Sequence, residues 1–180
     1  MKTIGLLGGM SWESTDLYYQ QINKMVQMKL GKLHSAKVVL ISVDFAEIEE
    51  LQHKGLWDEA GLYLKDKAIQ LEKGGADGIV LCTNTMHKVA SYIENSTTIP
   101  FIHIADATAT EILSQNIKKI GLLGTAFTME QDFYKSRLEE KGLEVITPNE
   151  TNRKVVHDII YNELCLGVIN EESQKKYINV

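Results

Sequence analysis

The 180-residue chain is 44% hydrophobic and 24% charged, which is typical of a soluble globular protein with one substantial core or two small ones. Its formal net charge of -5 argues against a nucleic-acid partner or a polybasic membrane surface, because both depend on clustered lysine and arginine. The apolar N-terminal stretch is too short for a signal peptide, and the two cysteines, Cys82 and Cys165, cannot build a disulfide framework. We therefore expect a cytoplasmic protein that binds a small molecule, with no nucleic acid and no membrane as partner.

Strands and helices are predicted to alternate along the first part of the chain. Short apolar, β-branched runs predict strands at residues 2–7, 37–43, 77–82 and 101–104. Apolar residues at helical spacing predict helices at residues 12–30, 45–51, 56–73, 86–94 and 106–114. Ser11 or Ser14 and Asp44 are expected N-caps, and Gly74 with Gly75 is expected to end a helix. This alternation, with short links, predicts an α/β fold with a parallel sheet covered on both faces.

A five-residue repeat predicts a second, related unit. Residues 120–124 read Ile-Gly-Leu-Leu-Gly, identical to residues 4–8, and a polar turn and a helix follow in both places. The second unit is expected to begin with a strand at the repeat, 120–124, and to contain helices at 129–140 and 152–167 and a strand at 143–146. We interpret the chain as two pseudo-symmetric, doubly wound parallel-sheet domains, residues 1–100 and 101–180.

Three predicted strands end in turns of small polar residues. The most informative reads Thr-Asn-Thr-Met-His at residues 83–87, after the apolar run 78–82, and the others lie at residues 8–11 and 124–128. At the carboxyl edge of a parallel sheet, such turns can offer amides and hydroxyls to a carboxylate or a phosphate. A single turn of this kind is better explained by helix capping, whereas the three together favour an anion pocket.

Only one of Cys82 and Thr83 can face a ligand, because adjacent residues of an extended segment point to opposite faces. Cysteine is usually buried and Cys82 ends an apolar run, so we expect Thr83 to face the pocket. His87 is expected to pack or to cap a helix rather than to act as a base. The histidines and cysteines lack metal-ligand spacing and the glycines lack a nucleotide-binding pattern, so neither a metal nor a nucleotide is expected.

Four segments carry distinctive motifs. They read Gly-Gly-Met-Ser-Trp-Glu-Ser-Thr at residues 8–15, Cys-Thr-Asn-Thr-Met-His at 82–87, Gly-Thr-Ala-Phe-Thr at 124–128 and Ile-Tyr-Asn-Glu-Leu at 160–164. Together they resemble the cofactor-independent aspartate/glutamate racemases, and the resemblance extends over essentially the whole chain. It is closest to the branch in which threonine stands where relatives carry the cysteine of a Cys-Asn-Thr motif.

The resemblance implies racemisation of aspartate or glutamate without pyridoxal phosphate and with no other cofactor. One residue removes the α-proton and a second, on the opposite face of the substrate, returns a proton, because a single base returns the proton to the side that it left. The resemblance makes Thr83 the first catalytic residue. The residues that it suggests for holding the charged groups of the substrate are Met10, Ser11, Gln52, Asn84, Thr85 and Thr125.

The sequence departs from the family pattern in two ways. A threonine hydroxyl is a far weaker acid than a thiol, so Thr83 should favour one enantiomer of the substrate. The second base of the family is a cysteine in a Gly-Cys-Thr-Glu motif, which these 180 residues do not contain and which Cys165 does not replace. We therefore expect a shortened racemase, a homodimer, with a second domain incomplete at its C-terminus and with impaired activity. The alternative is a noncatalytic protein, derived from a racemase, that binds an amino acid or a dicarboxylate.

Overall fold

The chain divides into two compact units in a computed structural model that describes all 180 residues. The units are Met1–His103 and Ile104–Val180, and each contains its own parallel sheet. The predicted α/β class is thus confirmed. The division falls after His103 rather than after residue 100, because the strand that follows Pro100 pairs with the sheet of the first unit. None of the helices combines the length and the apolar character needed to cross a membrane.

The sheet of the first unit has four parallel strands in the order β2-β1-β3-β4. They are β1 (Thr3–Gly8), β2 (Lys37–Ser42), β3 (Gly78–Leu81) and β4 (Phe101–Ile102). Strand β1 lies between two neighbours, and its residues Leu6 and Leu7 are fully buried. A strand buried on both faces reads as a continuous apolar run, which is why the pattern predicts it so clearly.

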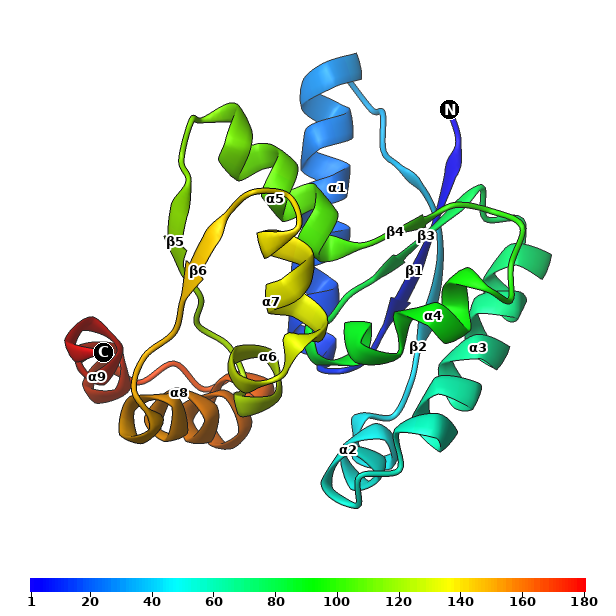
Figure 1. Ribbon diagram of the computed structural model, residues 1–180. Coiled ribbons are helices and arrows are strands. Elements are labelled where there is room, and N and C mark those ends of the chain that lie inside the picture. Colours follow the sequence, from blue (N-terminus) through cyan, green and yellow to red (C-terminus); the bar gives the residue numbers. More distant parts are fainter. The chain divides into compact units, whose positions relative to one another are not determined.

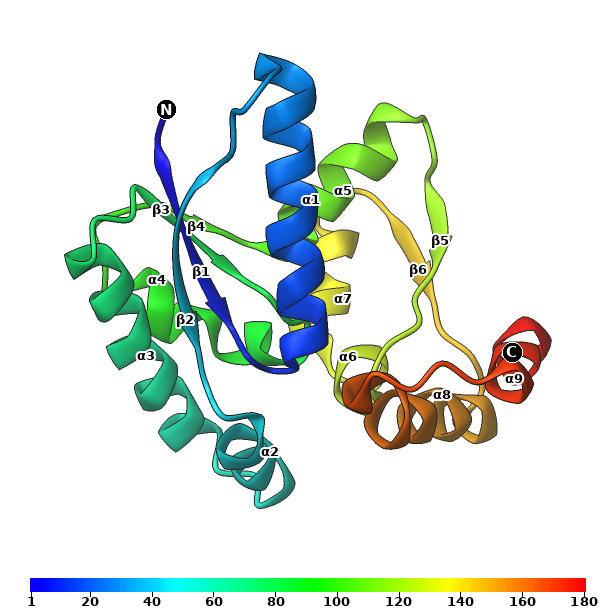
Figure 2. The same cartoon turned by 180° about the vertical axis from the view of Figure 1, so that it is seen from behind.

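Helices cover both faces of this sheet (Figures 1 and 2), with α1 (Trp12–Leu30) on one face and α3 (Trp57–Lys73) and α4 (Ala90–Glu94) on the other. Helix α2 (Phe45–His53) follows β2, and a 3₁₀ helix, η1 (Thr85–Val89), follows β3. The single helix expected over residues 86–94 is therefore wrong in its first half, where the chain winds more tightly. The α3 residues Leu64, Ala68 and Leu71 are fully buried in the main core.

Two of the predicted helix ends are confirmed and one is not. The Asp44 carboxylate accepts a hydrogen bond from the amide of Ala46 and so caps α2. After α3, Gly75 has φ +89°, a left-handed conformation that stops the helix. Ser11 occupies the N-cap position of α1, but its side chain makes no capping bond.

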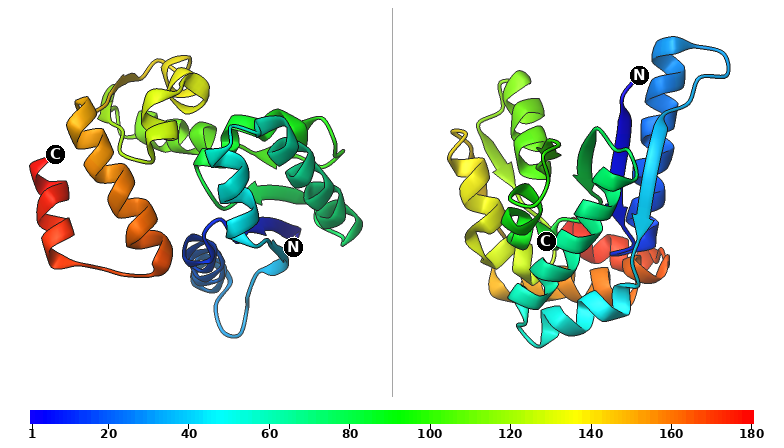
Figure 3. Two further views of the ribbon diagram at one scale, coloured as in Figure 1. Left: turned by 90° about the horizontal axis from the view of Figure 1, so that it is seen from below. Right: turned by 90° about the vertical axis from the view of Figure 1, so that its right-hand side faces the viewer.

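The second unit contains a two-stranded parallel sheet, β5 (Lys119–Gly121) paired with β6 (Glu144–Ile146). Its helices are α5 (Ile104–Ser114), α6 (Ala126–Glu130), α7 (Asp132–Glu139), α8 (Glu150–Asn162) and α9 (Glu171–Asn179), with a 3₁₀ turn, η2 (Leu164–Leu166). The helix expected over residues 129–140 is two helices, because Gln131 is extended, with ψ 151°. The helix expected over 152–167 ends at Asn162. Helices α8 and α9 lie side by side (Figure 3, left), where the Ser173 hydroxyl donates to the Glu163 carboxylate at 2.7 Å.

The two copies of the five-residue repeat occupy corresponding positions in their units. Each supplies a strand, β1 or β5, that pairs in parallel with the next strand along the chain. Each copy ends in a glycine that packs against a threonine of the following helix, Gly8 against Thr15 and Gly124 against Thr128. A Cβ on Gly8 would lie 2.3 Å from the Thr15 side chain, so only glycine allows this close approach.

Candidate functional site

The ends of β1, β2 and β3 meet at one edge of the first unit's sheet. The amide of Val43 donates to the Gly8 carbonyl at 3.0 Å, and the amide of Cys82 donates to the Leu7 carbonyl at 2.8 Å. These bonds continue the pairing of β1 with β2 and with β3 by one residue past the end of each of those two strands. The turn at residues 8–11 and the turn at residues 83–87 are therefore adjacent at the carboxyl edge of the sheet, as predicted for parallel strands.

The turn after β1 is tightly packed. Gly9 has φ +94°, and a Cβ there would lie 2.2 Å from the Val43 carbonyl oxygen, so this position requires glycine. The Gly9 amide donates to the Thr15 hydroxyl at 2.8 Å. Met10 and Ser11, both predicted to bind substrate, are buried, and the peptide bond between them is cis. The turn thus presents a backbone surface held by α1 rather than a row of exposed side chains.

The turn after β3 separates Cys82 from Thr83 as the strand alternation predicts. The Cys82 side chain is fully buried, and burial raises the pKa of its thiol to about 12. At neutral pH it is therefore protonated and a poor nucleophile. Thr83 and Asn84 are partly exposed at the edge of the sheet. The core position expected for Cys82 is confirmed, which leaves Thr83 as the residue of this pair that a ligand can reach.

Gln52 and Thr85 lie in the same unit but are buried. Gln52 comes from α2, and its amide nitrogen lies 3.0 Å from the Met86 sulfur in η1. This contact joins the helix after β2 to the turn after β3. The structure thus brings six of the seven predicted residues to one edge of one sheet, and their roles in binding and catalysis stay predictions.

Thr125 lies in the second unit and acts as a helix cap. Its hydroxyl accepts a hydrogen bond from the Thr128 amide at 3.3 Å, while the Ala126 amide donates to His157 Nδ1 at 3.1 Å. Two amides at the start of α6 are therefore already bonded within the unit. The capping interpretation explains this turn, and the arrangement gives no support to an anion pocket there.

Two charged residues near the first unit's site received no role from the sequence. The Lys88 ammonium in η1 lies 3.9 Å from the centre of the Trp57 ring, and burial lowers the pKa of Lys88. Glu13, in the first turn of α1, has one carboxylate oxygen, Oε2, that is buried without a hydrogen-bond partner. Glu13 belongs to the distinctive segment at residues 8–15, and Lys88 directly follows the turn at 83–87. Their closeness to these motifs in the sequence was the feature that could have identified both residues as candidates.

No group of three or more histidine, cysteine, aspartate or glutamate side chains is placed to hold a metal ion. The polar groups at the edge of the first sheet are mostly hydroxyls, amides and backbone atoms. Such groups suit an organic ligand with carboxylate and ammonium groups.

The fold defines an α/β protein with two parallel-sheet units, and the candidate ligand site lies at one edge of the first unit's sheet. Comparison with known sequences gives the family: the profile of the Asp/Glu/hydantoin racemases matches residues 7–180. The chain belongs to the Asp/Glu/hydantoin racemase family.

Individual relatives agree with this assignment. The broad specificity amino-acid racemase RacX of Bacillus subtilis (strain 168) is 30% identical over 148 residues, which cover 79% of this chain and 63% of RacX. A crystal structure of a candidate Asp/Glu racemase from Yersinia pestis is 58% identical, with a TM-score of 0.91, and the match covers all of this chain and 79% of that protein. An aspartate racemase homologue from Pyrococcus horikoshii OT3 is 37% identical, with a TM-score of 0.80, over 93% of this chain and 74% of that one. The chain thus spans less than two thirds of the length of RacX.

Proposed function

We propose that the chain supplies Thr83 as one of the two catalytic residues of an amino-acid racemase that acts on aspartate or glutamate without pyridoxal phosphate. The observation that carries the proposal is the contrast at the end of β3, where Cys82 is buried and protonated while Thr83 is partly exposed. This contrast supports Thr83, rather than Cys82, as the group that would exchange a proton with a ligand at this edge. The racemase relatives, RacX and the Pyrococcus homologue among them, support the reaction class.

The substrate would lie against the turns that follow β1 and β3. Backbone amides and the Asn84 side chain there would hold its carboxylate, and the same donors would stabilise the negative charge that develops when the α-proton leaves. The Thr83 hydroxyl is a much weaker acid than a thiol, so it is almost entirely protonated and is a poor general base. Removal of the α-proton from the side that faces Thr83 should therefore be the slower direction, and one enantiomer should be preferred.

The test is incubation of each enantiomer of aspartate and of glutamate with the protein in deuterated water. Proton NMR follows loss of the α-proton signal, and chiral chromatography follows formation of the opposite enantiomer. We expect exchange that is slow and unequal between the enantiomers, and little racemisation by these 180 residues alone, because they contain no Gly-Cys-Thr-Glu segment.

Two variants make the result specific. Thr83→Val keeps the shape of the side chain and removes the hydroxyl, so it should abolish exchange. Thr110→Val, at an exposed position of α5, is the matched control and should leave exchange unchanged. Equal exchange by Thr83→Val and the unaltered protein would rule out the assigned role of Thr83.

A noncatalytic protein that binds an amino acid or a dicarboxylate is the second candidate. The observation that favours it is that the thiol at the end of β3, Cys82, is buried and protonated, while the accessible Thr83 carries only a weakly acidic hydroxyl. Isothermal titration calorimetry with aspartate distinguishes the two candidates. Binding without any α-proton exchange, in the presence of either enantiomer, would select the binding protein.

A further inference from the structure

The turn that carries Thr83 has an unusual hydrogen-bond arrangement at its first residue. In η1 the His87 amide donates to the Asn84 carbonyl, three residues back, at 3.0 Å. In an α-helix the same amide would instead bond to the carbonyl of Thr83, four residues back. In the 3₁₀ turn the His87 amide is therefore not bonded to the Thr83 carbonyl.

The side chain of His87 supplies a donor in its place. Its Nδ1 atom lies 2.7 Å from the Thr83 carbonyl oxygen. A carbonyl oxygen can only accept, so Nδ1 must carry the proton, and this contact selects the Nδ1–H tautomer of the imidazole. The ring thus closes the turn from Thr83 to His87 in place of a backbone hydrogen bond.

The imidazole is held rigidly enough to do this. His87 is 3% exposed, in the interior of the first unit. Its ring packs edge-on against the His103 ring, with centroids 4.4 Å apart, and against the Phe101 ring at 5.6 Å. Phe101 belongs to β4 and His103 directly follows it, so the ring packs between its own turn and the edge strand of the sheet. A buried ring with packed neighbours places its donor with little freedom.

We propose that His87 is a positioning residue for the proposed reaction: its Nδ1–H bond to the Thr83 carbonyl sets the orientation of the Thr83 hydroxyl at the edge of the sheet. This inference rests on the proposed function and deepens it. His87 touches the backbone of Thr83 and acts through it. The preorganisation of a reacting group by such supporting contacts strongly affects rate, because small misplacements are costly.

Two substitutions of His87 separate positioning from packing. An asparagine amide can place a donor where Nδ1 lies, whereas a glutamine amide reaches toward the position of Nε2. His87→Asn should therefore keep the bond to Thr83, and His87→Gln should lose it. His34→Gln, at an exposed position after α1, controls for the glutamine substitution itself.

The kinetic readout is the rate of α-proton exchange in deuterated water. His87→Gln should lower kcat by about 100-fold with KM almost unchanged, as expected for a misplaced reacting group. His87→Asn should recover most of the rate, and His34→Gln should match the unaltered protein. Equal rates for His87→Gln and the unaltered protein, or equal losses for both His87 variants, would overturn the positioning role.

The spectroscopic readout does not depend on turnover. Long-range ¹H–¹⁵N correlation spectra of the unaltered protein should show the Nδ1–H tautomer of His87 at neutral pH. The amide signals of Thr83 and Asn84 should shift in His87→Gln and return toward their original positions in His87→Asn. An Nε2–H tautomer, or unshifted Thr83 and Asn84 signals in His87→Gln, would refute the bond. If the spectra agree and no variant exchanges the α-proton, the proposed function fails while the turn geometry stands.

Discussion

The hydroxyl of Ser14 donates a 2.8 Å hydrogen bond to the carbonyl oxygen of Cys82, 68 residues away in the sequence. The same hydroxyl lies 3.0 Å from the Ser11 carbonyl, in the turn that precedes α1. One side chain therefore joins the turn after β1, the first turn of α1 and the end of β3. This bond holds the residue immediately before Thr83. Its loss should therefore affect both the stability of the first unit and the position of Thr83.

Replacing Ser14 by alanine should destabilise the first unit by about 1 kcal/mol, because the Cys82 carbonyl loses its partner in a partly buried place. Urea unfolding monitored by circular dichroism measures the change. Ser114→Ala is the matched control, since the Ser114 hydroxyl donates to the Glu111 carbonyl at an exposed position. That variant should change the free energy of unfolding by less than about 0.5 kcal/mol. The assignment is wrong if the two variants lose the same stability.

The repeat gives a sharp comparison between two glycines in the same sequence context. A Cβ on Gly5 would lie 2.9 Å from the Ala76 Cβ and 3.1 Å from the Gly78 carbonyl oxygen, whereas a Cβ on Gly121 meets nothing within 4 Å. Gly5→Ala should therefore cost about 1 to 3 kcal/mol through overpacking. Gly121→Ala should be neutral or should stabilise the protein by about 0.5 kcal/mol, because alanine lowers the conformational entropy of the unfolded chain. Thermal unfolding of the two variants side by side tests this, and a reversed order of their melting temperatures would contradict it.

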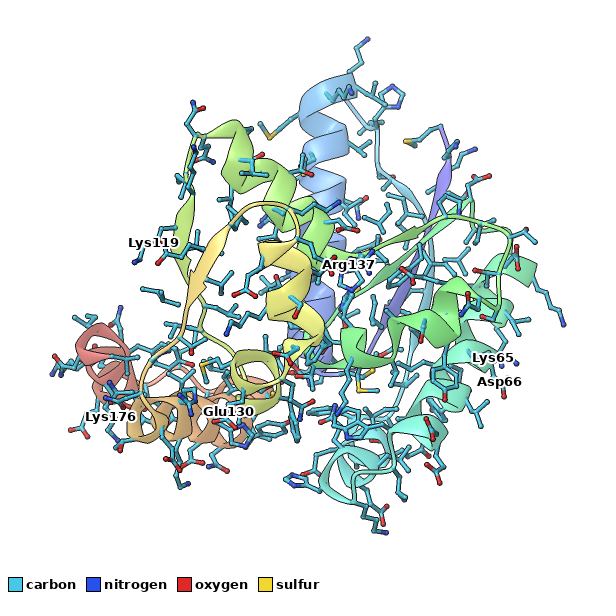
Figure 4. The ribbon with its side chains drawn as sticks, in the orientation of Figure 1. Lys65, Asp66, Lys119, Glu130, Arg137 and Lys176 are labelled. Atoms are coloured by element: carbon cyan, nitrogen blue, oxygen red, sulfur yellow. The ribbon has the colours of Figure 1, made fainter.

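The second unit contains a two-point ion pair that should matter more than its other surface pairs. Arg137, labelled in Figure 4, donates to the Asp106 carboxylate from Nε at 3.1 Å and from Nη2 at 2.7 Å, and so ties α7 to α5. Both side chains are only about one third exposed. Asp106→Asn should cost about 1 kcal/mol because the geometry is bidentate and partly shielded.

The control for this ion pair is Asp158→Asn. Asp158 pairs with Lys154 one helical turn away on α8, and both side chains are largely exposed. Such pairs contribute about 0.3 to 0.5 kcal/mol. Raising the salt concentration should reduce the loss in Asp158→Asn more than the loss in Asp106→Asn, because exposed pairs are screened more strongly. A larger loss in Asp158→Asn than in Asp106→Asn would show the ranking to be wrong.

The buried Cys82 thiol should make stability fall at alkaline pH. Burial raises its pKa to about 12, so the folded protein keeps the thiol proton at pH values where the unfolded chain, with a thiol pKa of about 8.5, has lost it. The unfolded state then binds fewer protons, and the free energy of unfolding falls by about 1.4 kcal/mol for each pH unit between about 9 and 12.

Cys82→Ala removes this contribution. The stability difference between the unaltered protein and the variant should be constant from pH 6 to pH 8, where the thiol is protonated in both states. It should shrink by at least about 1 kcal/mol between pH 8 and pH 10. Urea unfolding at each pH provides the values, and a difference that stays constant up to pH 10 would show that the thiol is not held protonated by the fold.

The parts of the fold that the sequence predicts well are those in which local pattern and burial agree. The strand containing Leu6 and Leu7 is apolar because both of its faces are covered, so its pattern is unambiguous. Asp44 and Gly75 mark helix ends by their own side-chain or backbone chemistry. The α/β class and the family follow from the same segments. The prediction that Thr83 is accessible and Cys82 buried needed only strand alternation and the usual burial of a cysteine that ends an apolar run.

Other features depended on contacts between distant segments. The expected helix over residues 86–94 begins as a 3₁₀ turn, in which the His87 ring bonds to the Thr83 carbonyl and packs against Phe101 and His103. Ser14 looked like a possible cap, yet its hydroxyl reaches the end of β3. Thr125 matches a binding motif but caps its own helix. Spacing along the chain cannot reveal which of several possible acceptors lies nearest to a side chain in space.

The sequence by itself determined the fold class, the family and the identity of the turn that carries Thr83, because these depend on hydrophobic periodicity, turn residues and motif order. Only the tertiary structure decided how that turn is supported. Identical pentapeptides place Gly5 against Ala76 and Gly121 in open space, and a histidine one turn beyond Thr83 becomes the donor to its carbonyl. The physical reason is that packing distances and hydrogen-bond partners are set by segments that the chain brings together only when it folds.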